Sequence, residues 1–213
     1  MVSSVFGGKN ETIGEKLRSL FRSDNEPIDK KAIMAHYRIK TAIGRISSYL
    51  DKLEQRDREL FQVIVESLVK KDERRAKMYA KEVSEIRKVA RQLITAKYAL
   101  EQVALKLETF LIFGGAMKEL VPVIGVMKEA TTLLRSVAPD VWIDLQYALR
   151  ELEAAMSAGI AEIGYEVDVG LDSEARRILE EARIAAEQSI KEKYAELPRA
   201  IATEEEVKSE ESV

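Results

Sequence analysis

The sequence lacks cysteine altogether, and its 213 residues include one histidine, four prolines and only 6% aromatic residues. Without cysteine, no disulfide, thiolate metal site or cysteine nucleophile can form, which fits a reducing compartment. A di-iron helical bundle takes two histidines from Glu-x-x-His motifs, so His36 alone cannot supply that centre. We interpret His36 as a helix-surface or seam residue and Trp142 as a packing anchor.

Long apolar runs are missing as well. No stretch of about 18 apolar residues is present, so no segment is expected to span a bilayer. The N-terminus has no apolar core followed by a small-residue cleavage site, which argues against a secretory signal. No glycine-rich phosphate loop follows a strand, and no residues suggest a catalytic triad. The sequence therefore predicts a cytoplasmic protein that is not an enzyme and uses no cofactor and no metal.

The formal net charge of −3 hides a division between the two halves of the chain. Residues 1–115 hold 23 Lys and Arg against 16 Asp and Glu, a net charge of +7. Residues 116–213 hold 11 against 21, a net charge of −10. Such asymmetry predicts an anionic partner for the first half, with the second half able to compete for the same surface.

Hydrophobic periodicity predicts an all-α protein built on a long antiparallel helical hairpin. Apolar residues recur at steps of 3 and 4 over about 28–69, and Asp57 fills the one skipped position. A similar pattern covers about 73–113, and the polar stretch KKDERRAK (70–77) predicts the turn between them. The first helix would be about 60 Å long, which is typical of a coiled-coil seam. Shorter helices are expected at about 116–137, 140–163 and 173–196.

The N-terminal leader predicts contact with an anionic membrane. Its apolar residues fall on one helix face and basic residues lie beside that face, a pattern that suits insertion at a membrane interface. The candidate membrane-binding residues are Val2, Val5, Phe6, Ile13, Lys16, Leu17, Arg18, Leu20, Phe21 and Arg22. An equally weighted alternative is that this face folds back on the hairpin.

The first hairpin helix carries a candidate basic surface. It comprises Lys30, Lys31, Arg38, Lys40, Arg45 and Lys52. Each basic residue near an anionic membrane contributes on the order of 1 kcal/mol. The alternative is a solvated helix face with i,i+4 pairs such as Glu54 with Arg58. Nucleic acid is not expected as the partner, because acids alternate with the bases and no aromatic residues are interleaved with them.

The pair Gly114-Gly115 ends the second helix pattern. It is either a simple C-terminal stop or a hinge that lets the following helices pack on the hairpin or extend from it.

These features together resemble ESCRT-III, and more closely the archaeal CdvB-type cell-division proteins. The most specific stretch is AKMYAKEVSEIRKVARQLITAKYALEQVALKLETF, which is flanked by the basic leader, the glycine break and the acidic helices. The resemblance implies a filament subunit that polymerises with itself and related paralogues on membranes. It also implies an acidic C-terminal region that inhibits assembly. The chain ends soon after Leu197-Pro198, without a winged-helix module, so we expect a shorter paralogue.

The resemblance divides the chain into four segments and adds one further partner. The segments are an amphipathic membrane-binding leader at 1–26, a basic hairpin core at 27–115, acidic regulatory helices at 116–196 and a disordered acidic tail at 197–213. The family's C-terminal region binds the MIT domain of an AAA+ ATPase of the CdvC type. The candidate docking residues here are Leu179, and Leu197 and Pro198 in the short element ELPRAI.

The hypothesis is therefore a cytoplasmic protein that is peripheral on the inner face of the cell membrane, at the division site, where it constricts or severs membrane necks. A membrane-maintenance scaffold resembling the PspA family and a soluble coiled-coil adaptor remain as alternatives.

Overall fold

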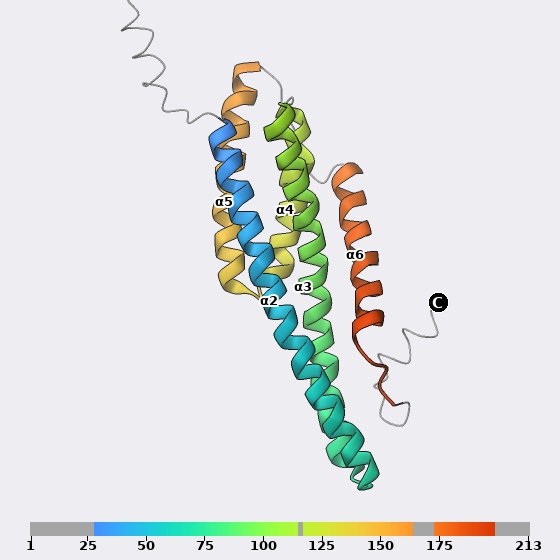
Figure 1. The fold of residues 1–213 in the computed structure, drawn as a ribbon. Coiled ribbons are helices and arrows are strands. Elements are labelled where there is room, and N and C mark those ends of the chain that lie inside the picture. The colour runs from blue at the N-terminus through green and yellow to red at the C-terminus, as the bar shows by residue number, and fades with distance from the viewer. Residues whose placement is uncertain (1–27, 115–116, 164–172, 199–213) are drawn as a thin grey trace, which may run out of the picture.

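The computed structural model describes residues 28–114, 117–163 and 173–198, which form helices joined by turns and short irregular segments, with no strand among them (Figure 1). This confirms the expected all-α fold and the long hairpin. The leader, Gly115 and the tail beyond Pro198 lie outside the described residues. The helices are α2 (Ile28–Val69), α3 (Glu73–Phe113), α4 (Val121–Leu134), α5 (Pro139–Ile163) and α6 (Ser173–Lys193), with a 3₁₀ turn, η1 (Met117–Leu120), before α4.

The apolar seam between α2 and α3 forms as its spacing predicts. Large side chains from both helices are fully buried there: Ile39, Ile46, Leu60 and Ile64 from α2, and Leu93, Leu100 and Leu107 from α3. Full burial of one such side chain stabilises the fold by about 1.5–3 kcal/mol. Asp57, at the skipped position, is also buried, with 3% of its surface exposed.

The turn between α2 and α3 is shorter than the polar stretch 70–77 and occupies only residues 70–72. Lys71 takes the left-handed conformation with a φ of 58°. The amide of Lys71 donates to the Leu68 carbonyl at 2.9 Å, and the amide of Asp72 donates to the Ser67 carbonyl at 2.8 Å. This is the Schellman arrangement at a helix C-terminus. The Asp72 carboxylate then accepts from the Arg75 amide at 3.1 Å and caps α3, so the polar residues after it are helical.

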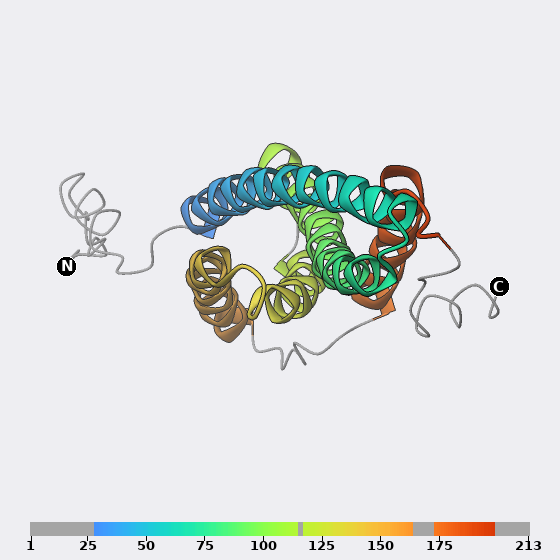
Figure 2. The same ribbon diagram turned by 90° about the horizontal axis from the view of Figure 1, so that it is seen from below.

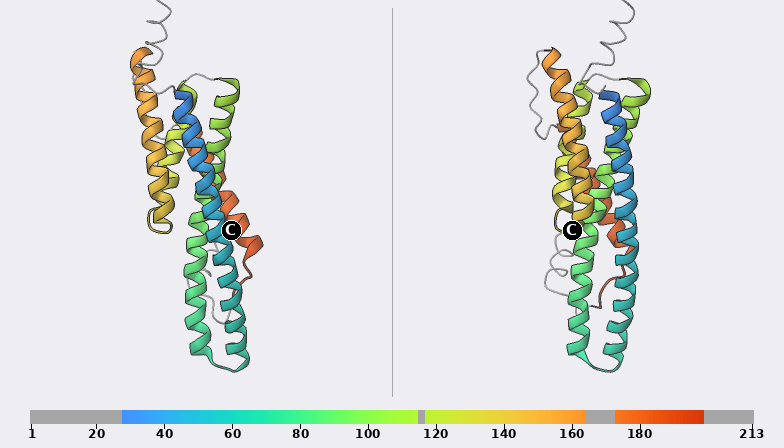
Figure 3. Two further views of the ribbon diagram at one scale, coloured as in Figure 1. Left: turned by 60° about the vertical axis from the view of Figure 1, so that its left-hand side comes forward. Right: turned by 90° about the vertical axis from the view of Figure 1, so that its left-hand side faces the viewer.

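The remaining helices cover one half of the hairpin. Helix α5 packs on α2 and α4, while α4 packs on α3 (Figure 2). Helix α6 lies along α3 on the other side and also contacts α4, as the turned views show (Figure 3). Pro122 is in the first turn of α4, where proline is tolerated. Trp142 on α5 is partly buried and packs against the main core, in line with its interpretation as an anchor.

We expect Lys71→Gly to raise the free energy of unfolding by about 1 kcal/mol, because an L side chain in the left-handed region costs about 1–2 kcal/mol. The larger unfolded-state entropy of glycine offsets part of this gain. Urea unfolding followed by circular dichroism measures the change. Lys70→Gly is the matched control, because it removes the same charge next door, where the amide still donates to the Glu66 carbonyl at 3.1 Å. The control should lower the free energy of unfolding. An increase in both variants would contradict the assignment of the effect to the left-handed conformation of Lys71.

Candidate functional site

Helices α2 and α5 meet along a line of opposite charges. The Arg45 guanidinium lies 2.6 Å from the Asp144 carboxylate and 4.0 Å from that of Asp140. Arg38, two turns earlier, lies 3.8 Å from Glu151, two turns later on α5. Each step along α2 is thus matched by an equal step backwards along α5, as antiparallel helices require. We call these five residues the charged seam.

Tyr49 extends the charged seam to the N-terminus of α5. Its hydroxyl donates to Asp140 at 2.8 Å. This hydrogen bond, followed by that from the Val141 amide and by the charge of Arg45, holds the pKa of Asp140 below its usual range despite some opposing desolvation. The same bond raises the pKa of the Tyr49 hydroxyl. The arrangement therefore favours an ionised Asp140 and a protonated Tyr49.

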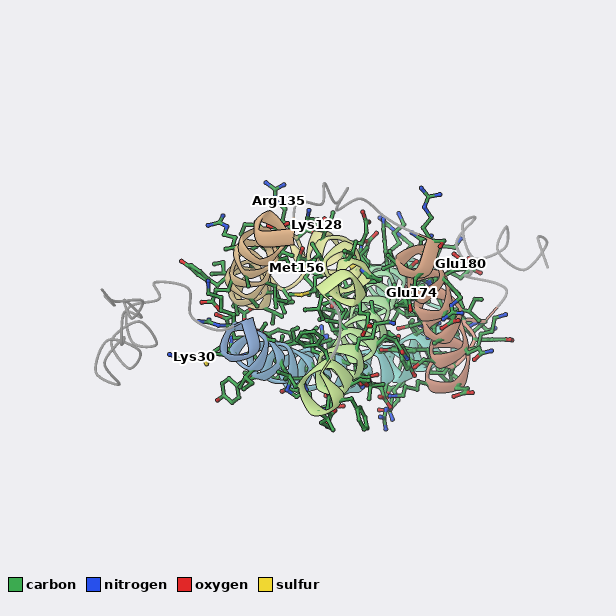
Figure 4. The ribbon with its side chains drawn as sticks, turned by 90° about the horizontal axis from the view of Figure 1, so that it is seen from above. Lys30, Lys128, Arg135, Met156, Glu174 and Glu180 are labelled. Atoms are coloured by element: carbon green, nitrogen blue, oxygen red, sulfur yellow. The ribbon has the colours of Figure 1, made fainter. Side chains whose placement is uncertain are left out.

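Helix α6 repeats the pattern on α3. The Glu187 carboxylate forms an ion pair with Nε of Arg91 at 2.8 Å, and Glu174 pairs with Lys106. Figure 4 shows Glu174 on the side of α6 that faces the bundle, and Glu180 farther round the same helix. Lys193 near the end of α6 makes the reverse pair, 3.8 Å from Glu54. Acidic side chains of both later helices thus contact basic side chains of the hairpin.

Apolar residues pack α6 against the bundle beneath these ion pairs. Its buried face consists of Ala175, Ile178, Leu179, Ala182, Ala186 and Ile190. The first four join the main core, and the last two pack with Ala90 and Ile94 of α3. Leu179, a candidate docking residue, is therefore only 8% exposed in this state.

The other residues singled out from the sequence lie in several places. Of the hairpin bases, Lys30, Lys40 and Lys52 are exposed, and Lys31 is half-buried. Figure 4 places Lys30 at the start of α2, far across the bundle from α6. The Lys52 ammonium lies 5.9 Å from the centre of the Tyr49 ring. Arg58 pairs with Glu54 as the i,i+4 spacing suggests.

Gly114 closes α3 with a φ of 65° and a ψ of 152°, values that suit glycine. His36 is half-buried in α2, and its Nε2 has no hydrogen-bond partner among the residues that the structure describes. Leu197 and Pro198 are half-buried.

The acidic partners Asp140, Asp144 and Glu151 were not among the residues predicted from the sequence. The division of charge pointed to an acidic second half. The spacings of four and seven residues between these acids also match those of Tyr49, Arg45 and Arg38 in reverse. That match could have suggested the pairing.

Within residues 28–114, 117–163 and 173–198, no cluster of three or more metal-ligating side chains is present. In the same residues, none of the helices is long and apolar enough to cross a membrane.

The family model of Snf7 matches residues 35–205, which covers the hairpin from the second turn of α2 onward and all the later helices. The chain belongs to the Snf7 (ESCRT-III) family. It is of the archaeal CdvB type, since it is 40% identical over 185 residues to "Cell division protein B1" of Sulfolobus acidocaldarius. That alignment covers 84% of this chain and 85% of the relative. Members of this family are structural scaffold proteins rather than enzymes.

Two further relatives extend this comparison. "Cell division protein B" of the same organism is 31% identical over 188 residues, which are 86% of this chain and 72% of the relative. "Vacuolar protein-sorting-associated protein 24" of Saccharomyces cerevisiae is 25% identical over 127 residues, 56% of this chain and 57% of the relative. No solved structure matches the chain significantly.

In this ESCRT-III protein we expect Tyr49→Phe to raise the pKa of Asp140 toward the ordinary aspartate value, because its main hydrogen-bond donor is removed. A depressed folded-state pKa contributes stability that is present above the unfolded-state pKa and is lost as the pH falls through the folded value. The variant should therefore lose less stability than the wild type as the pH falls below the ordinary aspartate pKa of about 3.9. Carboxyl carbon NMR titration measures the pKa, and an unchanged value would refute the assigned cause.

Proposed function

We propose that this protein is an ESCRT-III subunit of archaeal cell division that assembles with itself and related paralogues into membrane-bound filaments, which constrict or sever membrane necks. Its membership of the Snf7 family and its similarity to two archaeal cell division proteins support the cell-division role. Polymer formation and membrane action are our extension. In this proposal the protein is peripheral on the inner face of the membrane at the division site.

The observation that carries the mechanism is the charged seam. Arg38 and Arg45, two bases expected to meet an anionic partner, here contact the acids of α5. The phosphates of an anionic membrane would bind the same guanidinium groups. Helix α5 and the lipid surface therefore compete, and the described arrangement is the closed, membrane-free state.

Opening would proceed at the end of α3. Gly114, with Gly115 beside it, serves as the hinge, and the helices that follow swing from contacts within the molecule to contacts between subunits. The leader inserts its apolar face into the bilayer, and the bases of α2 line the lipid headgroups. The C-terminal region, through Leu179, Leu197 and Pro198, docks an AAA+ ATPase of the CdvC type that remodels the polymer.

The first test is co-sedimentation with vesicles followed by negative-stain microscopy, with anionic compared with neutral lipid. We expect the full chain to bind anionic vesicles and form filaments on them, and a variant without residues 1–22 to lose most of that binding. The leader of one subunit binds weakly alone, and arraying many copies on a filament multiplies its effect.

Binding that persists undiminished without residues 1–22 would contradict the role of the leader. Absence of pelleting, with one small oligomer on either lipid, would instead indicate a soluble coiled-coil adaptor. Lipid-dependent assembly that does not constrict membranes would favour a membrane-maintenance scaffold.

The competition for arginine has its own test. We expect the triple variant Asp140→Asn, Asp144→Asn and Glu151→Gln to bind anionic vesicles about 3- to 10-fold more tightly, because two arginines become available. The matched control Glu119→Gln, Glu192→Gln and Glu196→Gln removes the same charge from exposed positions whose carboxylates pair with no arginine among the described residues. An equal increase in vesicle affinity for both triple variants would show an effect of net charge and would contradict the proposed competition. Binding is measured at several salt concentrations, because screening should shrink the difference.

A further inference from the structure

Asp57, which interrupts the apolar seam of α2, forms an ion pair with an arginine of α3. Arg87 of α3 binds it in a two-pronged pair, with Nε 2.8 Å from Oδ1 and Nη2 3.2 Å from Oδ2. The side chains are only 4% exposed for Asp57 and 11% for Arg87. A buried ion pair is costly unless its remaining hydrogen-bonding groups are satisfied. The other contacts of Arg87 therefore matter.

Among the described residues, the other polar and ring contacts of Arg87 come from the segment that follows α6. Nη2 of Arg87 also donates to the Ala195 carbonyl at 2.7 Å. The guanidinium carbon lies 5.7 Å from the centre of the Tyr194 ring, within cation–π range. One arginine of the hairpin thus holds two consecutive residues of the C-terminal segment.

Apolar contacts flank this arginine on both sides. Tyr194 is 6% exposed and packs with Ala90, Ile94 and Ile190. Burial, and then the nearby carboxylates, raise the pKa of Tyr194 to about 12, so it remains protonated. Leu197 packs against a second cluster of the hairpin, which consists of Leu60, Ile64, Ala76, Ala80 and Val83. We call residues 194–197 the strap. Figure 1 shows this segment continuing from α6 toward the tip of the hairpin.

We propose that Asp57 and Arg87 form a binding site for the strap on the hairpin, so that the hairpin and any partner that binds the strap exclude one another. A leucine at position 57 would complete the apolar seam but could not orient a donor toward the Ala195 carbonyl. Recognition of that carbonyl is what the charged pair adds. A competing partner must offer apolar surface for Tyr194 and Leu197 and a donor for the carbonyl between them.

This inference deepens the proposed function, because Leu197 and Pro198 are the candidate docking residues for the ATPase. The strap contact itself is measured without lipid or ATPase. Failure of the vesicle experiments would therefore leave this proposal standing, and failure here would leave membrane assembly standing.

The experiment is hydrogen exchange by mass spectrometry on the full chain, together with limited trypsin digestion. Trypsin binds the residues around its cleavage site in an extended conformation. The rate of cleavage after Lys193 therefore reports how often the strap is released from the hairpin. The test variant is Asp57→Leu with Arg87→Met, which replaces the buried pair by apolar residues and so keeps the hairpin packed. We expect exchange at residues 194–197 and cleavage after Lys193 to be about tenfold faster than in the wild type.

The matched control is Arg56→Met with Glu82→Leu. That pair also joins α2 to α3, at 2.9 Å, and the structure records no contact between it and the strap. It should leave exchange and cleavage at the strap unchanged. If the folded Asp57→Leu, Arg87→Met variant exchanged and cleaved at the strap as slowly as the wild type, the proposal would be overturned. The pair would then serve only to fix the register of α2 against α3.

If the test variant instead loses protection in α2 and α3, Tyr194→Ala decides the matter. It keeps the buried pair and removes the aromatic contact of the strap. Faster cleavage after Lys193 would support the strap site, and cleavage at the wild-type rate would refute it.

Discussion

The apolar seam between α2 and α3 is the constraint on which the rest of the molecule depends. Because the two helices bury Ile39, Ile46, Leu100 and Leu107 against each other, they form a rigid rod with further faces to its sides. Helices α4 and α5 occupy one side and α6 another. The charged residues that face these later helices are in register only because the seam fixes the rotation of each rod helix about its own axis.

Apolar burial and charge have separate tasks in the closed state. An exposed ion pair such as Arg45 with Asp144, whose side chains are 48% and 40% exposed, contributes about 0–1 kcal/mol. One fully buried isoleucine or leucine contributes about 1.5–3 kcal/mol. The later helices are therefore held mainly by residues such as Ile178 and Leu145, which are buried. The ion pairs set the register and determine which outside surface can replace the acids.

The hairpin was predictable because its apolar residues follow steps of 3 and 4 without a break other than Asp57. The start of α3 was harder to place, because four of the five residues after Asp72 are polar and the cap is the clearest mark of a helix. The division of charge indicated that acidic residues of the second half could bind the basic half. It could not foretell that Asp144 meets Arg45, since that pairing depends on how α5 is rotated and shifted along α2. The contacts of Asp57 were equally hidden, because its partner Arg87 lies 30 residues away on the next helix. The Ala195 carbonyl that Arg87 also binds lies a further 108 residues along the chain.

The main core joins the hairpin to the helices that cover it, and this has a consequence for association. Val123, Met127, Leu145 and Leu149 are buried together with residues of α2 and α3. A single molecule that opened in water would expose this surface on both parts. Such an intermediate would be too costly to accumulate unless a second molecule covered it at once. Opening and association would then form one cooperative event, with a nucleation threshold in protein concentration rather than a gradual growth of oligomers.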